Sequence, residues 1–358
     1  MKTLLFSIAF IIAISTQSQT VHVVDNNQGS GAQFTTIQAA VDAATANDII
    51  YVQPSPNSYG NILMTKPLSI YGIGHIPELN AGQVASISDI YFRSGNASGS
   101  KISGLYINNI YLDLTTDNNH DVIITNNRIA YIGGNSSTSR ANNAIISGNY
   151  IRNANFNAID IYSSQNWIIS NNIIEQPNTS STWSTFSRFN ASTIFNNNII
   201  WTRQNGDANN SIQLFNNCSG TQISNNIFLF RGTNVENMNL GSNNALTFQN
   251  NLTYSYNSTL DALSGTNIDN SDPQFVSFNP NASLNSTSND YQIQAGSPAE
   301  NAGTDGNDLG VYNGNFPFNL RGYPTELPYL TDFVIYNNII SAGTPLNINI
   351  KANANINN

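Results

Sequence analysis

The amino-acid sequence predicts an all-β solenoid, a parallel β-helix with one short capping helix at its N-terminal end. The main observation is a short sequence motif that recurs seven times between residues 102 and 253. Each copy begins with an apolar residue, continues with small or polar residues, most often Asn, and ends with a pair of apolar residues. Successive copies start 22, 22, 23, 26, 28 and 25 residues apart. A period of this length is typical of solenoids, whose units bury their apolar faces only by stacking on their neighbours.

The composition of each unit favours strands over helices. The apolar residues are mainly Ile, Val, Phe and Tyr, which pack well on pleated sheets, whereas a helical repeat needs helix-forming residues at a 3.6-residue spacing. Residues 158–176 form the clearest copy. There Ile159 and Ile161 alternate with Asp160 and Tyr162, which places the two pairs on opposite faces of a strand. Two further strands, WIIS and IIEQ, meet at an Asn-Asn corner.

One position of the repeat is nearly always asparagine. The seven aligned copies place there Leu105, Asn127, Asn149, Asn172, Asn198, Asn226 and Asn251. Stacked coil on coil, these amides are expected to hydrogen-bond along the solenoid axis as an asparagine ladder. Asn and Gly also tolerate the left-handed backbone that tight corners require. We therefore interpret these residues as structural, not as ligands for a substrate.

The first 20 residues are expected to be a secretory signal peptide outside the fold. Lys2 supplies a positive n-region, residues 4–14 an apolar h-region, and residues 15–20 a small and polar exit. No later stretch has the apolar length needed to cross a membrane, so we expect no transmembrane segment. Within residues 34–52, apolar residues at helical spacing predict a short amphipathic helix that covers the open end of the stack.

One solenoid domain is expected over residues 21–327, as a monomer. We expect residues 328–358 to form C-terminal strands that pack on or follow the last coil; the alternative is the start of a truncated β-sandwich. The net charge is −9, or −10 without Lys2, and only 9% of residues are charged. Such a surface argues against nucleic acid as a partner. The lone cysteine, Cys218, has no intrachain disulfide partner and is expected to be buried.

Several stretches resemble secreted bacterial proteins of the pectate-lyase-like superfamily, which are right-handed parallel β-helices. Residues 31–74, from GAQFTTIQ to IYGIG, are similar to the N-terminal cap and first coil of that superfamily, and the ISNNII phrase is similar to its inner coils. Residues 272–276 and 291–314 are similar to its closing coils. The resemblance implies secretion and a right-handed β-helix. It implies no single activity, because this fold hosts lyases, hydrolases, epimerases, adhesins and non-catalytic proteins.

In this superfamily the binding groove usually runs along the first strand of successive coils. Alternation along the corresponding strands of this chain predicts the exposed, substrate-binding residues Tyr91, Arg93, Tyr111, Tyr162, Gln213 and Phe215. Aromatic rings stack on the apolar faces of sugars while polar groups bond the hydroxyls, so the expected partner is an extracellular polysaccharide. Alternatively, these are ordinary exposed residues of a sheet in which Tyr has a high propensity.

The candidate catalytic residues on the same strands are Arg188, Asp160 and Asp113. Lyases of the superfamily often use Lys or Arg to take the proton next to a uronate carboxylate, and Arg188 is the best-placed arginine. A hydrolase needs clustered carboxylates. We place the strand of the intervening coil at residues 136–140, which contain no acid. Asp113 and Asp160 then lie two coils apart, and at roughly 4.8 Å per coil their separation is near 10 Å. The chain lacks the NTD, DD and GHG motifs of polygalacturonase-like enzymes. It also lacks the WIDH-like and RxPxxR motifs of the best-known pectate lyases. These absences argue against the known catalytic arrangements.

No residue is assigned to a metal and no cofactor is expected, with calcium as the alternative. The three histidines are scattered along the chain. The turn TTDNNHD holds Asp117, His120 and Asp121, and we interpret it as a solvated turn rather than a calcium site. Asp305 and Asp308 also lie in a turn without the spacing of an EF-hand.

Three functions fit these observations. The favoured one is a secreted or cell-surface β-helix that binds polysaccharide without catalysis. The first alternative is a polysaccharide lyase acting on an acidic, uronate-containing glycan, although the acidic net charge repels a polyanion unless a basic patch or calcium intervenes. The second alternative is a structural or adhesive surface protein.

Overall fold

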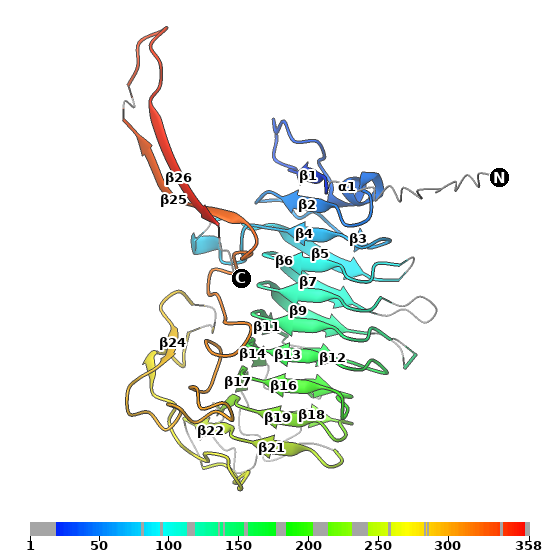
Figure 1. Cartoon of the computed structure of the whole chain (residues 1–358), viewed down its shortest axis with the longest axis vertical. Coiled ribbons are helices and arrows are strands. Elements are labelled where there is room, and N and C mark those ends of the chain that lie inside the picture. Colours follow the sequence, from blue (N-terminus) through cyan, green and yellow to red (C-terminus); the bar gives the residue numbers. More distant parts are fainter. Residues whose placement is uncertain are drawn as a thin grey trace, which may run out of the picture.

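The computed structural model shows a stack of coils built from two parallel sheets, with a projecting hairpin near its N-terminal end (Figure 1). It describes residues 19–79, 82–93, 96–112, 119–134, 137–138, 140–153, 157–176, 184–202, 214–230, 243–256, 259–282, 284, 286–336 and 339–354. The predicted parallel β-helix is therefore confirmed.

The first sheet has ten strands, one from each successive coil. In spatial order they are β1 (Val21–Val24), β2 (Ile49–Val52), β4 (Ser69–Tyr71), β6 (Lys101–Ser103), β8 (Ile123–Thr125), β10 (Ile145–Ser147), β13 (Ile168–Ser170), β16 (Ile194–Asn196), β19 (Gln222–Ser224) and β21 (Thr247–Gln249). All neighbours pair in parallel, as the stacking of coils requires.

The second sheet has twelve strands and divides into two branches. It begins with β3 (Ile62–Leu63), β5 (Ser86–Tyr91), β7 (Tyr106–Tyr111) and β9 (Arg128–Gly133). Beyond β9, the strands of this sheet follow two separate branches. The short branch is β12 (Ile159–Asp160), β15 (Phe186–Ser187) and β18 (Phe215–Asn216). The long branch is β11 (Tyr150–Arg152), β14 (Ile173–Gln176), β17 (Ile199–Thr202), β20 (Ile227–Phe230) and β22 (Leu252–Ser255).

The core between the sheets is a set of apolar rows that run along the axis. The row from the middle of the first sheet is fully buried and consists of Ile50, Ile70, Ile102, Ile124, Ile146, Ile169, Phe195 and Ile223. Burying a side chain of this size contributes about 1.5–3 kcal/mol. Because each row is shared between neighbouring coils, no coil is stable alone. Cys218 is also buried, and burial raises the pKa of its thiol to about 11.

The corner between the first sheet and the long branch consists of two consecutive residues that have different structural roles. The first has a left-handed backbone, as at Asn171 (φ 56°) and Asn197 (φ 54°), which Asn and Gly adopt at the least cost. The second is the predicted ladder residue. The carboxamide oxygen of each ladder Asn accepts the backbone N–H of the ladder residue in the preceding coil, at 2.9–3.0 Å. The predicted ladder is confirmed, and Asn267 extends it by one rung.

The N-terminal end of the stack is covered by the predicted helix, α1 (Ile37–Ala43). The Thr36 hydroxyl caps it by accepting the Ala39 N–H at 3.3 Å. Its buried residues, Ile37, Ala40 and Val41, face β1, β2 and β3. A short 3-10 turn, η1 (Pro77–Leu79), follows β4. No helix in the described part of the chain is long and apolar enough to cross a membrane.

The outer face of the long branch is covered by the chain that follows the last coil. This covering segment (residues 260–327) includes the antiparallel pair β23 (Phe275–Ser277) and β24 (Asp290–Ile293). Its apolar side chains form a second core with outward residues of the long branch, such as Ile173, Ile199 and Ile227. The sequence pattern did not predict this cover.

The left-handed corner residues hold the covering segment in place. The Asn171 amide donates to Val311 O at 2.9 Å, and the Asn250 amide donates to Ala302 O at 2.8 Å. Asn225 exchanges two hydrogen bonds with Thr304, at 2.9 and 3.0 Å. Further toward the N-terminal coils, Pro324 lies so close to Gly104 that a Cβ there would be 2.6 Å from the proline ring. The segment thus runs back along the stack (Figure 1).

The C-terminal strands differ from one part of the expectation. Strands β25 (Pro328–Ile335) and β26 (Ile348–Ala354) are present, but they pair with each other as an antiparallel hairpin. In the described part of the chain neither strand contacts another helix or strand, so the expectation that they pack on the last coil is wrong. The reason is the covering segment, which carries the chain back toward the N-terminal coils before the hairpin begins (Figure 1).

The buried ladder predicts a position-dependent loss of stability. Asn172→Ala removes the acceptor of the Asn149 N–H and the donor to Ile146 O, all inside the core. We expect the free energy of unfolding to fall by about 3 kcal/mol, because several buried polar groups lose their partners. Asn267→Ala is the matched control, since this last rung is only half-buried, and it should cost about 1 kcal/mol. Guanidinium unfolding midpoints compare the two. Equal losses would contradict the ladder's role.

Candidate functional site

The outer face of the second sheet, away from the long branch, carries an in-register row of residues, one per coil. From β3 through the short branch, the row consists of Leu63, Tyr91, Tyr111, Gly133, Asp160, Ser187 and Asn216. A second row lies two residues earlier on the same face and consists of Asp89, Asn109 and Tyr131. We call these two rows the tyrosine face.

The first coils of the tyrosine face form an aromatic stack with polar edges. The rings of Tyr91 and Tyr111 are parallel at 5.2 Å, and the Tyr131 ring is tilted against Tyr111 at 5.7 Å. The guanidinium of Arg93 lies 4.0 Å from the centre of the Tyr91 ring. Asp89 accepts hydrogen bonds from the Tyr91 hydroxyl at 2.8 Å and from the Asn109 amide at 2.7 Å. The hydrogen bond to Asp89 is the main reason why the pKa of Tyr91 is raised.

The middle coils of the tyrosine face carry an ion pair. Arg188 donates from Nε to Asp160 Oδ1 at 2.8 Å and from Nη2 to Asp160 Oδ2. The carboxylate side chain is 5% exposed and the arginine side chain 37%. The guanidinium also lies 3.7 Å from the centre of the Tyr162 ring. Nη1 of Arg188 has no hydrogen-bond acceptor among the described residues, so this edge of the guanidinium is open to a ligand.

Burial dominates the electrostatics of this pair. It raises the pKa of Asp160 to about 6, although the hydrogen bonds and charge of Arg188 act in the opposite direction. The pKa of the neighbouring Tyr131 hydroxyl is raised well above its ordinary value, first by burial and then by the Asp160 carboxylate. At neutral pH the site therefore holds a carboxylate whose charge is balanced by one arginine.

Two residues of this cluster have a strained backbone. Arg188 has φ 60° and Tyr162 has φ 47°, in the left-handed region that costs a bulky residue about 1–2 kcal/mol. The residue that corresponds to Arg188 in the next coil is Asn217 (φ 55°), which adopts this conformation more easily. The strained backbone at Arg188 therefore coincides with a side chain that forms an ion pair, a combination that points to a hypothesis of function.

Gly133 makes the close approach between Tyr131 and Asp160 feasible. A Cβ at this position would lie 2.2 Å from Asp160 O and 2.7 Å from the Tyr131 hydroxyl. The Tyr131 hydroxyl donates to Gly134 O, which fixes the ring beside the row. In the coil between Tyr111 and Asp160, the Tyr131 hydroxyl therefore lies where a side chain at position 133 would otherwise stand.

The structure brings together most of the site residues predicted from sequence, in two groups. Tyr91, Arg93 and Tyr111 form the stack, and Asp160, Tyr162 and Arg188 form the ion-pair cluster. Asp113 and Gln213 lie outside the described residues.

Two register predictions are wrong. Phe215 was expected to be exposed, but it is fully buried among Phe186, Phe189 and Phe195, and the next residue, Asn216, faces outward. A one-residue shift of a strand exchanges its two faces, and the phenylalanine cluster favours the shifted register. The coil before Asp160 also contributes β9 (Arg128–Gly133), not a strand at residues 136–140.

Sequence reasoning missed Asp89, Asn109 and Tyr131. The signal for Asp89 was available, because it lies two residues before Tyr91 in one strand and must share its face. Asn109 precedes Tyr111 by the same spacing. Tyr131 was missed because the strand of its coil was placed too late in the sequence.

No group of three His, Cys, Asp or Glu side chains among the described residues is arranged to hold a metal. Nδ1 of His120 accepts the Asn142 N–H at 3.0 Å, and Asp121 accepts from the Asn143 amide at 2.9 Å. Both residues therefore join neighbouring coils. Asp117, the third member of that turn, lies outside the described residues.

Comparisons with known proteins extend only to the fold. No protein-family model and no curated protein matches the sequence. Among solved structures, the pectin methylesterase from Aspergillus niger in deglycosylated form is 14% identical, over 69% of this chain and 89% of that chain, with a TM-score of 0.36. A form of the same enzyme with an N-acetylglucosamine stub is 14% identical over 70% and 88%, with a TM-score of 0.33. These values assign no activity or site residue to this chain.

The raised pKa of Asp160 predicts a carboxyl titration near pH 6. In the folded protein this group holds its proton more tightly than in the unfolded chain, so its contribution to stability is present below about pH 4 and is lost as the pH rises through 6. Arg188→Met should raise the midpoint further, because the cation that favours the carboxylate is removed. Carbon-13 NMR of the aspartate carboxyls measures this.

Asp305 is the internal control for that titration. Its hydrogen bonds from Asn307 lower its pKa, so its resonance should titrate below the ordinary range in both proteins. Asp160→Asn assigns the resonance. If the titration midpoint of Asp160 lies near 4 and Arg188→Met does not change it, the ion pair and its burial do not determine the pKa of this carboxyl.

Proposed function

We propose that the protein binds an extracellular polysaccharide along the tyrosine face. The observation that carries the proposal is the in-register alignment of the stacked tyrosines with the Asp160–Arg188 pair on one outer face of the second sheet. A linear glycan presents alternating apolar faces and hydroxyls along its length, and a row of aromatic and polar groups along the axis offers partners for both. The expected signal peptide at residues 1–20 supports an extracellular location.

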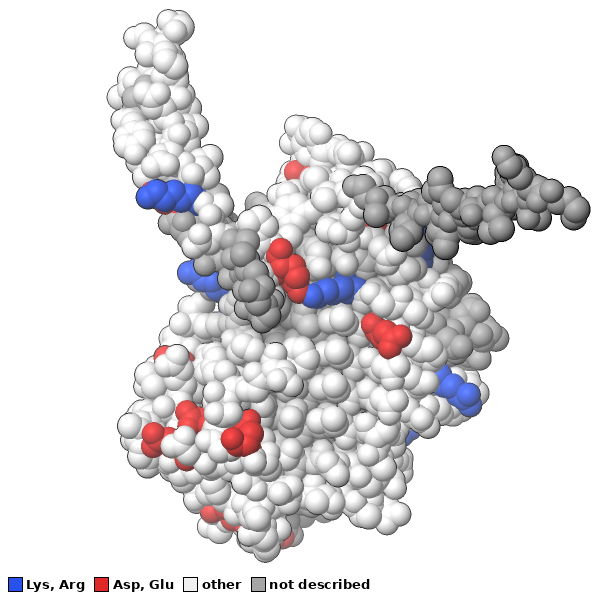
Figure 2. Space-filling view, in the orientation of Figure 1, with Lys and Arg blue, Asp and Glu red and all other residues white. Residues whose placement is uncertain are grey.

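The charges support a glycan over a nucleic acid. On the tyrosine face, Asp89 and Asp160 are offset by Arg93 and Arg188. Elsewhere, charged side chains are few and scattered over a largely uncharged surface on the face seen in Figure 2. A partner held mainly by counterion release needs many clustered basic residues, whereas sugars are bound through hydroxyls and ring faces.

The open edge of Arg188 favours a second candidate, a lyase acting on a uronate-containing glycan. Nη1 can bind a uronate carboxylate while Nε and Nη2 remain on Asp160. The ion pair stabilises the charged guanidinium, so this arginine is suited to neutralising the carboxylate and not to removing a proton. A base would have to come from another residue, and for that reason we rank binding above lyase activity.

Binding is tested by affinity gel electrophoresis of the mature chain in gels that contain pectin, alginate, xylan or a glycosaminoglycan. We expect retardation by at least one glycan. Tyr111→Ala should weaken it about fivefold, because the central ring of the stack is lost. Tyr336→Ala is the matched control, since this tyrosine is 68% exposed and directly follows β25 of the hairpin, outside the tyrosine face. Retardation that is equal in all three proteins would remove the tyrosine face from the binding site.

The lyase candidate is tested on the same glycans by ultraviolet absorbance of unsaturated uronate products, with and without calcium. A rising signal that Arg188→Met reduces at least tenfold would establish the lyase and the role of this side chain. A flat trace together with gel retardation would leave binding alone as the function.

A further inference from the structure

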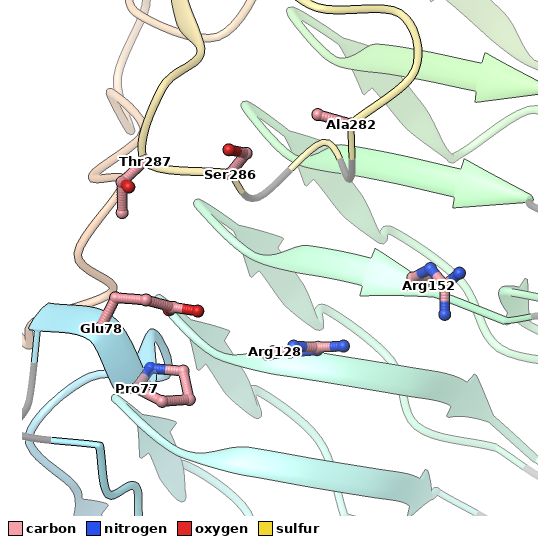
Figure 3. Close-up of a pocket in the computed structure, with 7 residues that line it drawn as sticks. All are labelled: Pro77, Glu78, Arg128, Arg152, Ala282, Ser286 and Thr287. Carbon is pink, nitrogen blue, oxygen red and sulfur yellow. The ribbon is translucent and has the colours of Figure 1, made fainter.

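A second candidate site lies on the opposite branch of the second sheet, where the covering segment leaves part of the sheet uncovered. A cavity of about 640 Å³ opens there between the strands, η1 and the cover. Its lining consists of Pro77, Glu78, Arg128, Arg152, Ala282, Ser286 and Thr287. Figure 3 shows the arginines on two adjacent strands, with Glu78 and Thr287 across the cavity from them. A volume of this size is within the range of small-molecule sites.

The two arginines come from neighbouring coils and share one face. Arg128 begins β9 and lies in register with Tyr150 of β11, and Arg152 follows two residues later. The guanidinium of Arg128 lies over two tyrosine rings, 4.6 Å from the centre of Tyr106 and 5.5 Å from that of Tyr150. These rings hold the cation in a fixed position on the floor of the cavity.

Both arginines keep hydrogen-bonding capacity for a ligand. Arg128 forms no hydrogen bond or ion pair with another side chain in the described ranges. Nε of Arg152 is 3.3 Å from Oε2 of the buried Glu175, but its N–H is not aligned for a hydrogen bond to any described residue. Each guanidinium carries five N–H donors in a planar fork that matches a carboxylate.

The surroundings do not compensate the charge of Arg128. The nearby His75 is fully buried, and its pKa is lowered to about 3, first by burial and then by the charge of Arg128, so it is neutral at ordinary pH. Glu175 accepts a hydrogen bond from the Tyr150 hydroxyl and lies beside Arg152. The only acid on the opposite wall among the described residues is the exposed Glu78.

We propose that this cavity binds a sugar acid of one or two residues, whose carboxylate is held between Arg128 and Arg152. The hydroxyls of Ser286 and Thr287 and the carboxylate of Glu78 are placed to bond the ligand's own hydroxyls. The site is separate from the tyrosine face, because it lies on the outer face of β9 and β11, whereas that face continues along the short branch. The proposal does not depend on the function of the tyrosine face.

Isothermal titration calorimetry with galacturonate and its dimer tests the proposal on the mature full chain. Saturable binding with a Kd of about 1 mM or tighter is expected, and glucose, which lacks the carboxylate, should not bind. Arg128→Met, which keeps the length of the side chain but removes its charge, should weaken binding about tenfold or more. Arg140→Met is the matched control, because Arg140 is exposed and does not line the cavity, and it should change the Kd less than twofold.

Arg128→Met could lose binding because it misfolds, so a second variant distinguishes a folding defect from the loss of the binding site. Thr287→Trp fills the cavity from the covering segment without changing the strands, and it should also abolish binding. The proposal is overturned if galacturonate does not bind, if Arg128→Met and Thr287→Trp bind it as the parent does, or if inorganic sulfate binds as tightly and displaces it. The last result would mean an adventitious ion only.

Discussion

The coil stack depends on the asparagine corner, which recurs in six successive coils from Asn127 to Asn251. Its first residue, such as Asn171, turns the backbone through the left-handed region, and its second, such as Asn172, hydrogen-bonds to the equivalent amides above and below. Because these bonds lie in the core and fix the height of every coil, equivalent strands meet in register. The stacked tyrosines and the two arginines of the cavity are aligned because β5, β7, β9 and β11 pair in register.

The features that repeat could be predicted from sequence, and those that depend on loop length could not. The ladder was predicted residue by residue because every copy contains the corner itself. Phe215 was placed on the wrong face because the number of residues between the corner and this strand varies between coils. Counting from the corner therefore does not fix which residues of the strand face inward. The covering segment was missed for another reason. The residues that contact each other, such as Asn171 and Val311, are 140 positions apart in the sequence, so no local sequence pattern predicts the contact.

The two branches of the second sheet differ in the residues on their outer faces. The long branch is apolar outward, with Ile173, Ile199 and Ile227, and the chain buries it under its own covering segment. The outward residues of the short branch, Asp160, Ser187 and Asn216, are polar, and the stacked tyrosines precede them on the same face. The strained Arg188 directly follows β15, whereas Asn217, which adopts this conformation more easily, occupies the same position one coil later. A costly backbone conformation at a residue whose side chain forms an ion pair is a reason to test this cluster for a binding role.

The covering segment changes how the solenoid should respond to stress. In a simple repeat protein each coil contacts only its neighbours, so terminal coils can fray one at a time. Here residues that follow the last coil are hydrogen-bonded to Asn250, Asn225 and Asn171 in turn, and then reach Gly104 near the other end. Because the covering segment is bonded to coils that are far apart in the stack, we expect opening of the last coil to break contacts with the middle coils as well. We therefore expect these coils to unfold together, as one cooperative unit, and not one at a time.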